Sequence, residues 1–147
     1  MLLELFSTLS TGLFAGAAIY INIVEHPARL QCGAHLAVPE FGSSYRRGAV
    51  LMGCLLTCSF SSALAVGLMS ARLGWFIGGI LLFCLLPFTL IMVMPINRQL
   101  LDPTVNEDAA LATRLLRRWG RLHAVRSLLG LTAFLLFVYL LPGEASR

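Results

Sequence analysis

The sequence has little charge and contains no lysine. Charged residues make up 12% of its 147 residues, and all eleven basic residues are arginines. A soluble globular domain carries about 25% charged residues, and a disordered chain combines low hydrophobicity with high net charge. Here 58% of the residues are hydrophobic, and the mean hydropathy is +0.83. The composition excludes both classes and indicates a membrane protein.

The motifs of several enzyme classes are also missing. The sequence has no phosphate-binding glycine loop, no nucleophile elbow and no dinucleotide-binding fingerprint. It has no Cys-x-x-Cys pair, and of its four cysteines Cys54 and Cys58 fall one helical turn apart. That spacing is poor for a disulfide. We interpret these two cysteines as small apolar packing residues, with a thiol redox pair as the alternative.

The sequence instead contains long runs without charged residues. They cover residues Leu5–Val24, Gly48–Ala71, Leu73–Asn97 and Ser127–Gly143. A helix needs about 20 apolar residues to cross a hydrocarbon core of ~30 Å, whereas membrane β-strands alternate in polarity over about 10 residues. The sequence therefore predicts an all-α fold, an integral membrane four-helix bundle with short loops, as a single domain over residues 1–147.

The spans are expected at about residues 3–25, 48–71, 73–96 and 121–141. An amphipathic helix over about residues 105–120 should lead into the fourth span, beginning at a capping box formed by Thr104 and Glu107. The segment 27–47 contains glycines, a proline and paired serines, so we expect it to be partly helical at best.

Small residues predict close helix contacts. The motifs Gly12-x-x-x-Gly16 and Gly74-x-x-x-Gly78 offer contact faces of the kind that membrane helices use, either within the bundle or between copies in a homo-oligomer.

The arginines predict the orientation in the membrane. Most of them fall in the segments that follow the first and third spans, and only Arg72 and Arg147 belong to the other side. Because cytoplasmic loops carry an excess of basic residues, we expect a bacterial inner-membrane protein with both termini outside. The arginines at 114, 117, 118 and 121 should lie along lipid headgroups, at about 1 kcal/mol each. Lipids thus account for the charge of +4, and no nucleic acid partner is expected.

Polar residues collect where three spans end. Ionisable residues near membrane depth are costly and are usually functional. The groups are Asn22, Glu25, His26 and Arg29 after the first span, Asn97 and Arg98 after the third, and Trp119, His123, Arg126 and Ser127 at the start of the fourth. Because successive spans alternate in direction, these three ends lie on the same side, and we expect them to converge.

This set of side chains suits proton abstraction. A histidine with a pKa near 6.5 accepts a proton at neutral pH, an arginine stabilises an enolate, and a tryptophan binds a flat aromatic face. A hydrophobic phenol or ketone could lose a proton here and react with oxygen without a metal. Alternatives stay open: Arg126 snorkels to the headgroups, Trp119 is an interfacial anchor, or His26 and His123 ligate haem or another metal.

Four motifs together resemble the anthrone oxygenase-like family of small four-span membrane proteins. They are Glu-His-Pro-Ala-Arg at 25–29, Ser-Tyr-Arg-Arg at 44–47, Met-Pro-Ile-Asn at 94–97 and Arg-Trp-Gly-Arg-Leu-His-Ala-Val-Arg-Ser at 118–127. With the segment 12–29, the resemblance covers nearly the whole chain. It implies oxidation of an anthrone to an anthraquinone, as in fungal members, without flavin or haem.

On the matching positions the resemblance gives candidate site residues. His26 and His123 would be bases and Arg126 the enolate-stabilising group. Asn22, Asn97, Trp119 and Tyr45 would bind and position the substrate.

Two functions follow from these observations. The first is a membrane oxidoreductase, a cofactor-independent monooxygenase acting on a hydrophobic aromatic or quinone-like compound. The alternative is a small non-catalytic membrane protein that serves in binding, transport or assembly.

Overall fold

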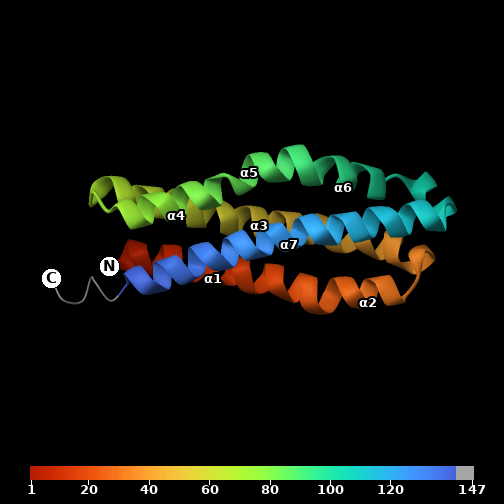
Figure 1. The fold of residues 1–147 in the computed structure, drawn as a ribbon, viewed down its shortest axis with the longest axis horizontal. Helices are drawn as coiled ribbons and strands as arrows, with labels where there is room; N and C mark the ends of the chain where they lie inside the picture. Colours follow the sequence, from red (N-terminus) through yellow and green to blue (C-terminus); the bar gives the residue numbers. More distant parts are fainter. Residues whose placement is uncertain (142–147) are drawn as a thin grey trace.

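The computed structural model of the chain describes residues 1–141, and every regular element in that part is helical (Figure 1). The elements are α1 (Leu2–Tyr20), η1 (Ile21–Glu25), α2 (His26–Gln31), α3 (Ala34–Met69), α4 (Leu73–Phe83), α5 (Leu85–Phe88), η2 (Thr89–Val93), α6 (Met94–Leu100), η3 (Pro103–Glu107) and α7 (Ala109–Leu140). The predicted all-α fold is confirmed. Arg147 lies outside the described residues.

The elements join into four rods that are long and apolar enough to cross a membrane. They extend over Leu2–Gln31, Ala34–Met69, Leu73–Leu100 and Ala109–Leu140. Large apolar side chains cover the outside of the bundle; Leu9 is 66% exposed and Ile91 is 69% exposed. Water-soluble monomers rarely expose such continuous apolar surface. The chain is an integral membrane protein built as a four-helix bundle.

The two ends of the bundle differ in what they contain. One end carries the N-terminus and the turn between α3 and α4, and we call it the terminal end (Figure 1). The other carries the α2–α3 and α6–α7 connections and most of the arginines, and we call it the arginine-rich end. The four α7 arginines before Arg126 are all exposed, as contact with headgroups requires. Which end faces the cytoplasm stays a prediction.

The expectation that residues 27–47 are partly helical at best was wrong. Only Cys32 and Gly33 lie outside a helix there. Gly33 has φ +76°, which lets the chain turn sharply between α2 and α3. The first turns of α3 then bury Ala37, Val38 and Phe41 in the core of the arginine-rich end. This tertiary burial outweighs the weak local helix signal.

The predicted capping box at Thr104 and Glu107 was also wrong. The Asp102 carboxylate caps η3 instead, accepting from the Thr104 backbone N–H at 3.0 Å and from its hydroxyl at 2.8 Å. These donors lower the pKa of Asp102. The Asp108 carboxylate caps α7 by accepting from two backbone N–H groups. As predicted, one unbroken helix leads into the fourth span, but it begins at Ala109.

Small residues pack the terminal end tightly. The Trp75 ring stacks on Phe137, with centroids 4.7 Å apart. A Cβ added to Gly67 would meet the Phe76 backbone at 2.7 Å, so α3 and α4 touch directly there. Cβ atoms at Gly12, Gly74 and Gly78 would each collide with a side chain of α7. These three glycines are therefore used in packing within the chain, and association between copies stays a prediction.

Prolines mark the irregular turns of the first and third rods. The π-helical segments η1 and η2 each end two residues before a proline, Pro27 and Pro95. A proline lacks the N–H and clashes with the carbonyl four residues earlier, and a wider turn relieves that clash. The break between α4 and α5 at Cys84 similarly precedes Pro87. Beyond this break, α5 and η2 run apart from α3 (Figure 1).

Candidate functional site

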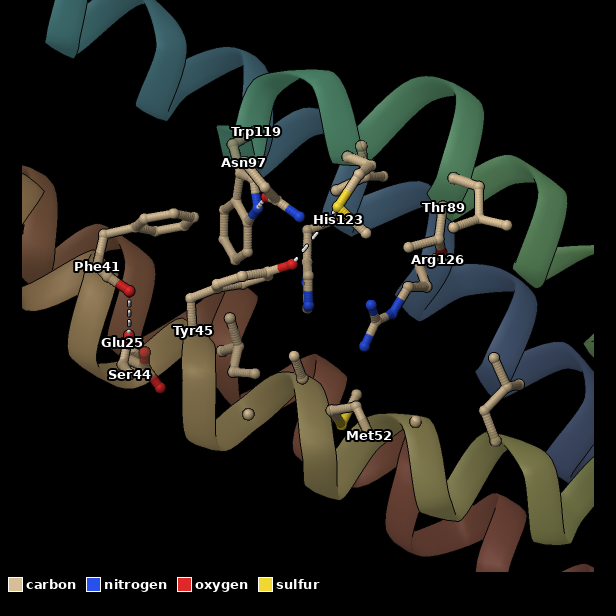
Figure 2. A pocket seen from close by; sticks show the side chains of 18 of the residues that line it. Glu25, Phe41, Ser44, Tyr45, Met52, Thr89, Asn97, Trp119, His123 and Arg126 are labelled. Atoms are coloured by element: carbon tan, nitrogen blue, oxygen red, sulfur yellow. Dashed lines mark hydrogen bonds between the residues drawn. The ribbon is translucent and has the colours of Figure 1, made fainter. Parts of the chain in front are cut away.

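A cavity of about 290 Å³ lies where α5 and η2 separate from α3. Its walls come from η1, α2, α3, the segment from α5 to α6, and α7 (Figure 2). Most of the lining is apolar, including Ile21, Met52, Leu56, Leu86 and Val93. A small, mostly apolar cavity with a few polar groups is the usual form of a small-molecule site.

Five of the residues predicted from the sequence line this cavity. They are Tyr45 on α3, Asn97 on α6, and Trp119, His123 and Arg126 on α7. Figure 2 shows the Tyr45 hydroxyl, the His123 ring and the Arg126 guanidinium directed toward the same space. These five residues come from three of the four rods, and the first rod adds Glu25 and Arg29 to the lining.

Asn97 and Trp119 hold each other in place. The Trp119 indole N–H donates a hydrogen bond of 2.8 Å to the Asn97 Oδ1 atom, and Asn97 is 2% exposed. Because indole is only a donor, this bond fixes which way the Asn97 amide faces. The amide N–H groups of Asn97 remain for other partners, such as an oxygen of a bound molecule.

His123 is a buried imidazole stacked on Trp119. Its ring centroid lies 4.7 Å from that of the indole, and its Nδ1 atom has no hydrogen-bond partner. The Ser127 hydroxyl donates to the backbone oxygen of His123 at 3.0 Å. The Asn22 amide donates in turn to Ser127. Asn22 therefore links the first rod to α7 and does not line the cavity.

His26 packs behind the tryptophan. Its ring centroid lies 5.2 Å from that of Trp119, and a Cβ at Gly120 would collide with its imidazole. His26 does not line the cavity. The geometry therefore presents one imidazole, that of His123, to a molecule bound in this space.

Arg126 lies against the cavity without an acidic partner. Its guanidinium carbon lies 5.3 Å from the centroid of the Phe14 ring, and its Nε atom is buried without a hydrogen bond. No carboxylate within residues 1–141 forms an ion pair with it. Because the guanidinium lines the cavity, this geometry differs from snorkelling to the headgroups. An unpaired cation beside an apolar cavity favours an electron-rich oxygen there.

A second arginine lines the cavity at the arginine-rich end. Arg29 is 5% exposed and forms ion pairs with Glu25 and Glu40. It also donates to the Ser44 hydroxyl at 2.9 Å, and its guanidinium lies over the Phe41 ring. We call these residues the Arg29 cluster. In contrast to Arg126, this arginine is neutralised by its neighbours.

Comparison with known proteins gives a match to a protein family. A family model described as anthrone oxygenase matches residues 41–136, which is more than half of the chain. The chain belongs to the anthrone oxygenase family. No curated protein and no solved structure matches it. The matched range contains Tyr45, Asn97, Trp119, His123 and Arg126, so every predicted residue that lines the cavity falls within the family match.

Several lining residues of this anthrone oxygenase family member were missed from the sequence. Phe41, Tyr45, Met52 and Leu56 follow one another at helical spacing on α3 and face the cavity. Only Tyr45 had been identified as a candidate. The signal was present, but it is recognisable only when residues 34–47 are taken as a helix.

The Arg29 cluster was also left out of the candidate site. Glu25 and Arg29 are spaced four residues apart, which favours an ion pair on a helix. The second carboxylate, Glu40, comes from α3 across the sharp turn at Gly33. That tertiary contact has no signature in the local sequence.

No group of three or more His, Cys, Asp or Glu side chains able to hold a metal occurs within residues 1–141. All four cysteines are free, and Cys54 is exposed. Haem or metal binding through His26 and His123 stays a prediction, for which the cavity itself offers His123 alone.

Proposed function

We propose that the protein is a membrane-embedded oxidoreductase that oxidises a lipophilic anthrone-type ketone with molecular oxygen. The observation that carries this proposal is the pair His123 and Arg126 on one face of an apolar cavity, with no carboxylate among residues 1–141 neutralising the arginine. Membership of the anthrone oxygenase family supports the same chemistry.

His123 acts as the base in this proposal. Its ring lines the cavity, so a neutral imidazole can take a proton from a bound molecule. The proton comes from the ring carbon of the anthrone that lies opposite the ketone. The electron pair left behind spreads onto the ketone oxygen and produces an enolate.

Arg126 stabilises that enolate. A cation placed where negative charge develops lowers the barrier most effectively in a site that excludes water. The Asn97 amide, which also lines the cavity, supplies a further hydrogen-bond donor. The Tyr45 hydroxyl, which donates to the Met94 sulfur at 3.7 Å, supplies another when it exchanges that weak bond for one to the bound oxygen. Trp119 offers a flat apolar wall to the aromatic rings.

Oxygen then completes the reaction. The carbanion carbon donates electrons to O₂ and forms a carbon–oxygen bond, and loss of water gives the second carbonyl. Overall, the anthrone and O₂ give the anthraquinone and H₂O. The proton held on His123 returns during the loss of water, which regenerates the base.

The test is oxygen uptake together with quinone absorbance, measured on protein in nanodiscs with a dihydroxyanthrone. We expect His123→Ala and Arg126→Ala each to lower the turnover rate by at least about 100-fold. Exposed residues of the same types provide the matched controls His35→Ala and Arg121→Ala, which should keep the wild-type rate. Empty nanodiscs correct for spontaneous oxidation.

Wild-type rates in both cavity variants would refute the proposed roles. A wild-type protein that binds the anthrone but does not accelerate its oxidation would refute the enzyme and favour the non-catalytic alternative.

A further inference from the structure

We propose that the ligand of this cavity reaches it sideways from the hydrocarbon layer, through a gap between α3 and η2. The choice of a lipophilic aromatic ligand rests on the proposed function. The route rests on separate observations, namely which lining residues are exposed and where they lie along the rods.

The gap is bordered by small or apolar residues that both line the cavity and face outward. Ala49 and Gly53 on α3 are exposed, and Leu90 on η2 is 62% exposed. Gly48 and Thr89, which are half-buried, complete the border. No charged side chain belongs to this set, which we call the lateral mouth.

The lateral mouth lies farther from the arginine-rich end than the charged residues Arg47 and Arg98 do. Gly53 follows the exposed Arg47 by six residues on the same helix, which corresponds to about 9 Å of helix length. Leu90 precedes the exposed Arg98 by eight residues, or about 12 Å. If these arginines lie at the headgroups, the lateral mouth opens to the acyl chains.

The other end of the cavity is bordered by residues that are bound to one another. The Arg29 cluster joins η1, α2 and α3 through two ion pairs and the bond to Ser44. The Phe41 and Tyr45 rings stack beside it, 5.6 Å apart. A flat apolar molecule that approached from water would have to displace this cluster, whereas the lateral mouth places only small or apolar groups in its path.

The apolar mouth and the polar interior of the cavity fit the two parts of one kind of ligand. A fused aromatic ring system passes the apolar mouth, and its oxygen meets Arg126, His123 and Asn97 inside. The route predicts a neutral ligand that partitions into lipid, such as a phenol or ketone with one polar edge.

Two variants of the lateral mouth change its width in opposite directions. A Cβ at Gly53 has no atom within 4 Å, so Gly53→Phe should fill the mouth without disturbing the packing. Gly16 on α1 is equally open and exposed, which makes Gly16→Phe the matched control. Leu90→Ala should widen the mouth, and Leu9→Ala, at a leucine of similar exposure on α1, is its control.

The probe is a hydroxyanthraquinone, added to protein in nanodiscs and followed by stopped-flow quenching of tryptophan fluorescence. We expect Gly53→Phe to lower the association and dissociation rates together by at least about tenfold. The Kd should change little, because the bound state is untouched. Leu90→Ala should raise both rates, which a merely destabilised protein would not do.

Rates equal to those of the controls in both mouth variants would overturn lateral access and place the entrance at the Arg29 cluster. The proposed function would survive that result, because it depends on the His123 and Arg126 variants. Absence of probe binding to the wild-type protein would overturn the lateral route as well.

Discussion

The terminal end and the arginine-rich end of the bundle are built from the same four rods but are packed differently. At the terminal end, glycines let α3 and α4 touch, and Trp75 stacks on Phe137 in the core. At the arginine-rich end, breaks before prolines separate the rods, and polar groups enter the space between them. The tight packing of the terminal end stabilises the protein. The cavity and the buried polar groups of the arginine-rich end lower its stability but form a site.

The largest effect on stability should come from removing the carboxylates that neutralise the buried Arg29 at the arginine-rich end. The double substitution Glu25→Gln and Glu40→Gln removes both anions from Arg29, which is 5% exposed. We expect the free energy of unfolding to fall by about 3–5 kcal/mol, the usual cost of an uncompensated buried ion. Unfolding of the protein in mixed detergent micelles measures it.

The control for this pair is Glu107→Gln, at an exposed carboxylate on η3. A double variant as stable as this control would mean that Arg29 is hydrated and does not depend on its carboxylates.

A smaller effect on stability is expected from replacing glycine by alanine at two positions of α3, one packed and one open. Gly67→Ala places a methyl group against the Phe76 backbone, which cannot move aside, whereas Gly53→Ala places one in open space. Overpacking typically costs about 1–3 kcal/mol, so Gly67→Ala should destabilise the protein by that amount. Gly53→Ala should leave it unchanged or slightly more stable.

Thermal unfolding of the two alanine variants in the same detergent makes the comparison. Equal melting temperatures would show that the terminal end is not more tightly packed than the arginine-rich end.

The smallest effect compares the two tryptophans. Trp119→Phe keeps an aromatic wall but removes the hydrogen bond to Asn97, worth about 0.5–1.5 kcal/mol. Because the Asn97 amide loses its anchor, we expect a rise in KM for the anthrone of up to about tenfold, since 1.4 kcal/mol corresponds to a factor of ten. Trp75→Phe, in the other core, should lower the melting temperature and leave KM unchanged.

Steady-state kinetics and melting temperatures of both variants test this division. If Trp75→Phe also changed KM, the two ends would be coupled and the contrast between them would fail.

The fold was largely predictable because its main signal is local. An uncharged run of sufficient length has few alternatives to a membrane-crossing helix, and the four rods follow those runs. The segment 27–47 was not predictable in this way. Its helix depends on burying Phe41 and its neighbours against α6, η3 and α7, which are distant in sequence.

The candidate site was predictable to the extent that polar groups stand out in apolar helices. Asn97, His123 and Arg126 were recognised for this reason, and all three line the cavity. Asn22 and His26 were recognised by the same signal but face elsewhere. They lie within and directly after η1, where the wider turn changes the direction of each side chain from that on a regular helix.

The wide turns before Pro27 and Pro95 make the first and third rods tolerant of a change in residue count that α7 would not tolerate. Each turn holds more residues than an α-helical turn of 3.6. Deleting one residue from η2 would let this stretch close into a regular α-helical turn, so that Asn97 would keep its place beside Trp119. Deleting one residue between Trp119 and His123, where α7 is regular, would rotate the residues beyond it by about 100°. Relatives that share this architecture should therefore differ in length at η2 more readily than within α7.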